Sequence, residues 1–165
     1  MAKPRKVRAR RRVHAATVRY PAFVIHSLDH AKAVLQAAHE NELRVELWSA
    51  AGAAAYAGAG WFKAVIDLAR SANPGVDFTA VLDCADLPGL ALGAFRVGIK
   101  AVCFTGAARV AAKLADIAAQ DGRELRRRRP SQTLDLHHEP DPLTSCRRWL
   151  STRRRPHDTD DRQDA

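Results

Sequence analysis

Two carboxylates stand where an α/β protein could use them for chemistry. Asp83 ends the apolar stretch VLD, and Asp86 follows three residues later. Neighbouring carboxylates push their pKa values apart, so that one stays protonated near neutral pH and can act as a general acid. Asp83 is therefore the candidate catalytic residue. Asp86 has a weaker claim, because it is also a suitable cap for a helix beginning at Leu87-Pro88, where Asp and Pro are both favoured.

His26 and Cys84 also lie at the ends of apolar stretches. Together they offer a thiolate and imidazole pair or half of a metal site. Two ligands are too few for a structural zinc, and a free Cys is commonly an inert core residue. We therefore predict no metal site, expect no zinc, and assign no cofactor. The pair His137-His138 lies in a polar stretch and is interpreted as solvated.

A loop rich in Gly and Ala spans residues 50–60 and precedes a helical pattern that begins at Trp61. Glycines there would let backbone N–H groups approach a phosphate at the start of the helix. The loop is neither a GxGxxG nor a GxxxxGKS motif, and close packing of helix on sheet explains its composition equally well. The candidate ligand-binding residues, at strand ends and in this loop, are His26, Ser49, Gly52, Tyr56, Cys84, Thr105 and Gly106.

These residues follow a repeating pattern of elements. Four times a short β-rich apolar run precedes a helical stretch, which is typical of βαβ units and a parallel sheet. Because parallel βα connections are right-handed, every strand-to-helix loop reaches one edge of the sheet, where α/β folds bind ligands. RELRRRR, residues 123–129, is a candidate fifth strand whose charges would protect a sheet edge. The four predicted strands are residues 23–27, 44–49, 78–84 and 100–104.

The predicted fold class is α/β, with four or five parallel βα units arranged as half of a TIM-like barrel or as an open three-layer sheet. The chain of 165 residues fits one domain, and its apolar fraction of 47% indicates a globular core. That domain spans residues 23–130. Residues 1–22 are predicted to be a basic disordered arm and residues 131–165 a mostly disordered polar tail, in which Cys146, Trp149 and Leu150 could dock as a short turn. A half barrel would leave an apolar inner face bare and so predicts a homodimer, whereas a doubly wound sheet predicts a monomer.

The net charge of +9 is concentrated at the ends of the chain. Residues 1–22 hold eight Lys or Arg and no acid, whereas residues 23–122 hold eight bases and ten acids. A basic arm can bind nucleic acid through phosphates, although it lacks the aromatic residues of a stacking platform. No apolar run approaches the roughly 20 residues of a membrane span, and three cysteines do not make a disulfide framework. We predict a cytoplasmic protein without a membrane partner.

Three stretches, SAAGAAAYAGAG, VLDCAD and AFRVGIKAVCFTG, resemble the corresponding part of the class II, zinc-dependent ketose-bisphosphate aldolases. In that family a Gly/Ala loop follows one strand, a later strand ends in His-Leu-Asp-His-Gly, and another ends in Phe-Asp-Gly. The resemblance covers about residues 23–122 and implies the first half of an eight-stranded barrel. It gives Asp83 the family's acid–base role. Val81, Cys84 and Thr105 replace the family's first His, its zinc-ligating His and the Asp of Phe-Asp-Gly.

The sequence thus predicts a small aldolase-barrel-like α/β domain that binds a carbonyl- or phosphate-bearing metabolite without aldolase activity. If the chain is an enzyme, the resemblance implies lyase-type acid–base chemistry. The alternative is a nucleic-acid or ribosome-associated protein that binds through its Arg-rich ends. Removal of residues 1–22 distinguishes the two, because it should abolish retention on nucleic acid and leave metabolite binding intact.

Overall fold

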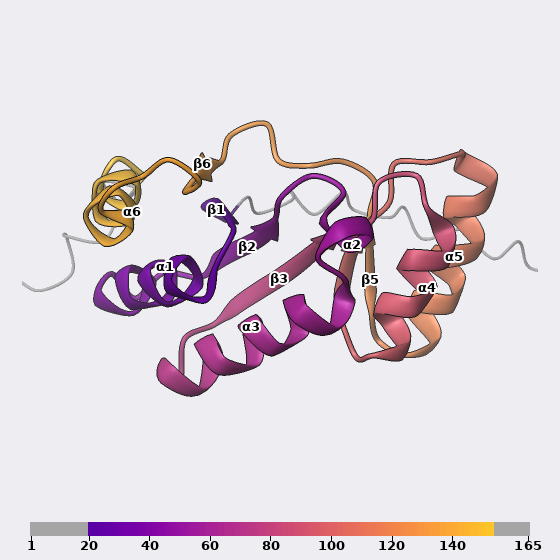
Figure 1. The fold of residues 1–165 in the computed structure, drawn as a ribbon, viewed down its shortest axis with the longest axis horizontal. Coiled ribbons are helices and arrows are strands. Elements are labelled where there is room, and N and C mark those ends of the chain that lie inside the picture. The colour runs from indigo at the N-terminus through magenta and orange to yellow at the C-terminus, as the bar shows by residue number, and fades with distance from the viewer. Residues whose placement is uncertain (1–19, 154–165) are drawn as a thin grey trace, which may run out of the picture.

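The computed structural model describes residues 20–153, which form a parallel six-stranded sheet with helices along it (Figure 1). The order of strands is β5-β4-β3-β2-β1-β6, and the sheet is open. The strands are Ala22–Ile25 (β1), Val45–Ser49 (β2), Phe78–Asp83 (β3), Ala101–Cys103 (β4), Glu124–Arg126 (β5) and Leu134–Asp135 (β6). The helices are Leu28–Glu40 (α1), Ala53–Tyr56 (α2), Ala59–Ala72 (α3), Pro88–Arg96 (α4), Ala108–Gln120 (α5) and Pro142–Ser151 (α6).

The prediction of an α/β fold with parallel strands is confirmed, and RELRRRR does supply the fifth strand, β5. Strands β1 to β5 follow one another across the sheet in chain order. Right-handed connections in such a series place every helix on the same face. The main core accordingly joins one face of the strands to the buried sides of the helices, including Val34, Phe62 and Phe95. The alternative of a three-layer sheet, with helices on both faces, is wrong for the described residues.

The second face of the sheet has its own small cluster of buried side chains, among them Val24, Trp48 and Val81. Glu46 of β2 and Arg126 of β5 meet across this face, with Arg126 Nη2 3.0 Å from Glu46 Oε1. Three strand intervals separate β2 from β5, about 14 Å in a flat sheet. Side chains stand roughly perpendicular to a sheet. A sheet that curves around them accounts both for this contact and for the burial of side chains on a face that no described helix covers. The second face is therefore concave, as in half of a barrel.

The concave face does not leave apolar side chains bare. Val24, Trp48 and Val81 are each 5% exposed or less. The sequence predicted a homodimer because a half barrel would expose an apolar inner face. These side chains are buried within the single chain, so the structure does not support that argument for a dimer. None of the helices in residues 20–153 is both long and apolar enough to cross a membrane.

After β5 the chain crosses to the opposite edge of the sheet, where β6 pairs with β1 (Figure 1). We call residues 127–133 the crossing segment. Beyond β6, helix α6 packs against α1, burying Cys146 and Leu150, and Arg147 forms an ion pair of 2.6 Å with Glu40. The prediction of a mostly disordered tail is therefore wrong for residues 131–153, because this stretch has an apolar side that α1 covers. Residues 1–19 of the predicted arm and 154–165 of the tail lie outside the described residues.

Capping residues mark where two of the helices begin. Ser27 caps α1, with its Oγ accepting a hydrogen bond of 3.1 Å from the His30 N–H. Asp141 caps α6 in the same way through Thr144, and Pro142 occupies the first turn. The expected cap at Asp86 is wrong: Leu87 is the N-cap of α4, and it makes no capping bond through its side chain.

Candidate functional site

The carboxyl ends of β2, β3 and β4 meet at one edge of the sheet, as the parallel order requires. Two of the predicted residues are joined there, because Ser49 Oγ accepts a hydrogen bond of 2.9 Å from the Asp83 N–H. Gly52, at the start of the Gly/Ala loop, donates its N–H to Asp83 Oδ1 at 3.0 Å. Gly52 has φ of +64°, a conformation that favours glycine. The structure thus brings Ser49, Gly52 and Asp83 together.

Asp83 is 3% exposed, and both of its carboxylate oxygens are engaged. Oδ1 accepts bonds from the N–H groups of Gly52 and Ala85, the latter at 2.9 Å. Oδ2 lies 2.6 Å from Arg129 Nη1, an ion pair between a buried carboxylate and a partly buried guanidinium. An acid–base step at Asp83 therefore requires Arg129 to leave this contact first.

Arg129 reaches Asp83 from the crossing segment, which runs along the carboxyl edge. Its Nη2 donates to the Ser49 carbonyl at 2.9 Å, and its guanidinium lies 5.3 Å from the centre of the Trp48 ring. Arg127 makes the corresponding contacts at β4, donating to the carbonyls of Phe104 and Gly106 at 2.9 and 2.7 Å. Two arginines thus tie the crossing segment to the ends of three strands.

A second ionic contact lies deeper on the concave face. Glu46 is 6% exposed and accepts hydrogen bonds of 3.0 Å from the Trp48 indole and from Arg126. Arg126 also lies 2.7 Å from Glu124, its neighbour on β5. The carboxyl edge and the concave face below it therefore hold carboxylates that are each matched by an arginine.

Sequence reasoning missed Glu46, Trp48, Arg126, Arg127 and Arg129. The run of arginines was interpreted as protection of a sheet edge and as part of the Arg-rich ends. The alternation of side chains along a strand could have indicated two of them. Glu46 and Trp48 are two residues apart on one strand and therefore lie on the same face of the sheet. No sequence pattern indicated which residues Arg127 and Arg129 would contact.

Cys84 points into the helix-side core rather than toward the concave face, and it is fully buried. Burial, and then the charge of the neighbouring Asp83, raises the pKa of the Cys84 thiol to about 12. The thiol is therefore protonated near neutral pH and is a poor ligand or nucleophile. Cys103 is buried on the other face.

Thr105 and Gly106 follow β4 at the carboxyl edge. The Thr105 N–H donates to the Ala85 carbonyl at 2.8 Å, which fixes the two loops together. A Cβ on Gly106 would lie 2.5 Å from the Phe104 ring, so glycine allows the chain to turn closely over Phe104. Tyr56 is 70% exposed on α2, and Asp86 is exposed before α4. Neither side chain forms a hydrogen bond with Asp83, whose partners are Ser49, Gly52, Ala85 and Arg129.

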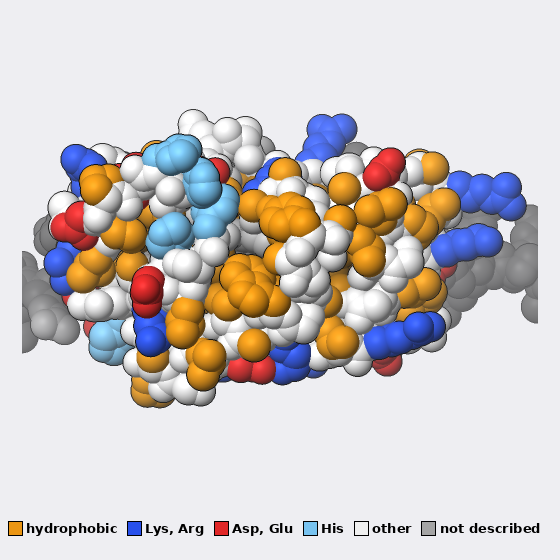
Figure 2. All heavy atoms as spheres, in the orientation of Figure 1, with side chains coloured by type: hydrophobic (Ala, Val, Ile, Leu, Met, Phe, Trp, Pro, Cys, Tyr) orange, Lys and Arg blue, Asp and Glu red, His pale blue; other side chains and the backbone are white. Residues whose placement is uncertain are grey.

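His26 lies apart from Asp83, at the junction of β1 and β6. Its Nε2 is 2.7 Å from Asp135 Oδ1, and its ring centre is 4.6 Å from that of His137. His30 and His138 extend the group, which is visible as a gathering of histidines near β6 in Figure 2. The structure thus places His26 with the tail histidines rather than with Cys84.

The zinc implied by the resemblance does not fit the residues present. Among residues 20–153 no three His, Cys, Asp or Glu side chains are grouped so that they could hold a metal ion. Cys84, at the position of a family ligand, is a protonated thiol in the helix-side core.

The chain is 32% identical to a fructose-bisphosphate aldolase of Xanthobacter flavus over 95 residues. The matched region covers 56% of this chain and 27% of the aldolase, so the chain spans about a quarter of that relative. No family model matches the chain. The similarity and the parallel fold together support an aldolase-like α/β domain.

Proposed function

We propose that the chain binds a small phosphate- or carbonyl-bearing metabolite at the carboxyl edge of the sheet and lacks zinc-dependent aldolase activity. The similarity to an aldolase named for a sugar bisphosphate supports sugar phosphates as the ligand class. The carboxyl edge is also the position at which α/β folds bind their ligands.

The observation that carries this proposal is the placement of Arg127. Its guanidinium is fixed over the end of β4 by two backbone carbonyls, and in the described part of the chain it has no carboxylate partner. Helix α5 begins directly beyond Gly106, and its N-cap residue, Ala107, makes no side-chain capping bond. Free N–H groups at a helix start and an unneutralised guanidinium are both suited to a phosphate.

Asp83 would serve any acid–base step on such a ligand. A phosphate bound near the crossing segment would compete with Asp83 for Arg129, because both anions prefer the same guanidinium. Release of Asp83 Oδ2 would leave a carboxylate beside the ligand, still oriented by the N–H groups of Gly52 and Ala85. This makes Asp83 the residue to test for chemistry.

The test is calorimetric titration of the full chain with dihydroxyacetone phosphate, fructose bisphosphate, inorganic phosphate and fructose. We expect the phosphorylated compounds to bind and fructose to bind at least about tenfold more weakly. Arg127→Gln should weaken binding about tenfold, whereas Arg128→Gln, at an exposed neighbouring position, should leave it unchanged.

Three results would overturn the proposal. The binding site is wrong if Arg127→Gln and Arg128→Gln bind the phosphorylated compounds equally well, or if none of these compounds binds. The absence of aldolase activity is wrong if purified protein cleaves fructose bisphosphate and a chelator stops the reaction.

A further inference from the structure

Charge is distributed unevenly over the described fold. Residues 20–83 hold four Lys or Arg and seven Asp or Glu, whereas residues 84–129 hold nine Lys or Arg and four Asp or Glu. Strands β1 to β5 follow chain order across the sheet, so this difference in sequence becomes a difference between two ends of the molecule. Residues 84–129 supply α4, β4, α5 and β5 at the end away from β6. Figure 2 shows Lys and Arg side chains gathered at this end.

Six of the nine cations at this end are exposed and form no ion pair with a carboxylate of the described residues. The other three, Arg123, Arg126 and Arg129, each lie in an ion pair. Residues 84–129 contribute only two acids outside such pairs, Asp86 and Asp116. We call the six exposed cations the cationic surface, and they are Arg96, Lys100, Arg109, Lys113, Arg127 and Arg128.

Four members of the cationic surface lie near the start of α5 or along it. The buried residues of α5 face the core, so the opposite side of the helix is exposed. Arg109 and Lys113 are one turn apart on that side, about 6 Å along the helix axis. Arg127 joins them at the carboxyl edge, because its guanidinium donates to the Gly106 carbonyl just before α5. Arg128 follows it and is exposed.

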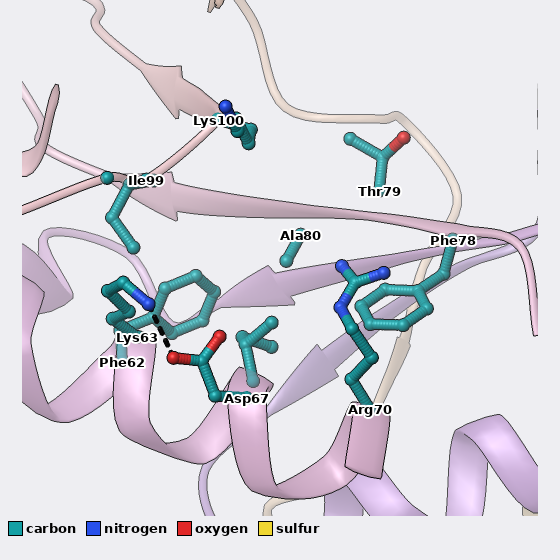
Figure 3. Close-up of a pocket in the computed structure, with 11 residues that line it drawn as sticks. Phe62, Lys63, Asp67, Arg70, Phe78, Thr79, Ala80, Ile99 and Lys100 are labelled. Carbon is teal, nitrogen blue, oxygen red and sulfur yellow. Dashed lines mark hydrogen bonds and ion pairs between the residues drawn. The ribbon is translucent and has the colours of Figure 1, made fainter. Parts of the chain in front are cut away.

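The cationic surface continues to the amino edge of the sheet. Arg96 lies in the last turn of α4, which packs against α5, and Lys100 directly precedes β4. On α3, by contrast, Lys63 forms an ion pair of 2.5 Å with Asp67, and Figure 3 shows Lys100 pointing away from that pair. The exposed cations thus cover both edges of this end, a span of about 20 Å, which is the length of the 13-residue helix α5.

The length of this surface and its side chains indicate the chemistry of a partner. A small anion would contact only a few of the cations, whereas a nucleic-acid duplex carries a phosphate about every 3.4 Å along each strand. The aromatic side chains of residues 84–129, Phe95 and Phe104, are at most 2% exposed, so they cannot stack on unpaired bases. Contacts to phosphates without stacking favour a duplex over a single strand.

We propose that the cationic surface binds double-stranded nucleic acid through its phosphates and independently of its sequence. Cations directed at phosphates fix the position of a duplex but do not distinguish its bases. The surface belongs to the folded part of the chain and is distinct from the basic arm, residues 1–22. It also does not depend on the binding of a metabolite at the carboxyl edge.

The experiment measures binding of the full chain to a fluorescently labelled DNA duplex by anisotropy. The two variants compared are Arg109→Gln with Lys113→Gln and Arg128→Gln, on the cationic surface, and Lys32→Gln with Arg70→Gln and Arg148→Gln, on α1, α3 and α6. Both variants lower the net charge by three and keep residues 1–22 unchanged. At about 100 mM salt we expect binding to weaken about tenfold in the cationic-surface variant and less than about threefold in the control variant.

The dependence of affinity on salt gives a second measure. Each lost phosphate contact lowers the slope of log affinity against log salt by about 0.9, so the cationic-surface variant should lose about 2 to 3 from this slope. The control variant should keep the slope of the unmodified chain. Two duplexes of unrelated sequence should bind the unmodified chain within about twofold of each other.

Acetylation of lysines in the unmodified chain tests the surface without any substitution. Bound duplex should protect Lys100 and Lys113 and leave Lys32 reactive. Equal loss of affinity in the two variants, or equal acetylation of Lys113 and Lys32, would overturn the proposal. Tighter binding to vesicles of anionic phospholipid than to the duplex, lost in the cationic-surface variant, would assign the surface to a membrane and contradict the proposal as well.

Discussion

At the carboxyl edge of the sheet, Arg127 and Arg129 hold the crossing segment against the ends of β2, β3 and β4, whereas the amino edge leaves a pocket between α3 and β3. The carboxyl edge is polar and tied by charge-assisted bonds. The pocket at the amino edge is lined by apolar side chains such as Ile66 and also by charged ones such as Arg70 and Lys100. One sheet thus presents two surfaces with different chemistry.

The difference follows from what the chain does after β5. The crossing to the far edge of the sheet passes over the carboxyl ends of the strands (Figure 1). The buried Asp83 carboxylate at that edge is then paired by Arg129 of the same segment. No described segment crosses the amino edge in this way, so small side chains there leave space that remains open.

The largest effect is expected from breaking the pair at the carboxyl edge. Arg129→Leu leaves the buried Asp83 carboxylate without its cation and should reduce the free energy of unfolding by about 3 kcal/mol. Arg128→Leu is the matched control and should cost less than about 0.5 kcal/mol, because Arg128 is exposed. Urea denaturation measures both.

Adding Asp83→Asn to Arg129→Leu should restore part of the lost free energy of unfolding. Equal stability of the two leucine variants would show that the ion pair between Arg129 and Asp83 does not stabilise the carboxyl edge.

A smaller effect is expected from loosening the far anchor of the crossing segment. Leu150 of α6 is fully buried, and Leu150→Ala should cost about 2 to 3 kcal/mol through the cavity it leaves. Leu68→Ala, at a leucine that is 55% exposed, should cost less than about 0.5 kcal/mol. Trypsin should also cleave the crossing segment faster in the Leu150 variant. Unchanged cleavage would mean that α6 does not anchor the segment.

The smallest effect concerns pH at the junction of β1 and β6. Burial, and then the charge of His26, lowers the pKa of His30 below its usual 6.5, against the opposing charges of Asp29 and Asp135. The folded chain therefore binds this proton less readily than the unfolded chain, so the contribution to stability is complete above about pH 6.5 and is lost as the pH falls below it. We expect Tm to fall by about 1 to 3 °C from pH 7 to pH 5.

His30→Asn tests this assignment, because the Asn oxygen can accept the bond of 3.2 Å that His30 Nδ1 accepts from the His26 N–H. This variant should show a weaker dependence of Tm on pH than His39→Asn, which removes an exposed histidine of the same helix. An identical pH dependence in the two variants would exclude His30 as the source.

Much of the fold could be predicted because its signals are local. The apolar run 78–84 predicted β3, observed at Phe78–Asp83, and the helical pattern that begins at Trp61 predicted α3, observed at Ala59–Ala72. Strand β6 was missed because two residues carry no periodicity. Helix α6 was foreseen only as a short docked turn at Cys146, Trp149 and Leu150. Its few apolar residues are interspersed with polar ones, so its full length of Pro142–Ser151 becomes evident only against α1.

The candidate site was predicted only in part. Asp83, Ser49 and Gly52 were expected at one edge because parallel strands end together, and they are in contact there. Arg129 was not expected, since it lies 46 residues from Asp83 and within a run of arginines that are identical in type. The difference among these arginines arises entirely from where each one falls along the crossing segment.

By itself, the sequence determined the parallel α/β class, the order of βα units and the edge at which their polar ends gather, because hydrophobic periodicity and the handedness of connections are properties of short stretches. Tertiary structure alone decided that Arg129 pairs with Asp83, that Cys84 faces the helices, and that Ala80 leaves a pocket. Each of these depends on which residues, distant in the sequence, are brought within a few ångströms of each other by the folding of the sheet and by the path of the crossing segment. No local sequence pattern encodes such a distance.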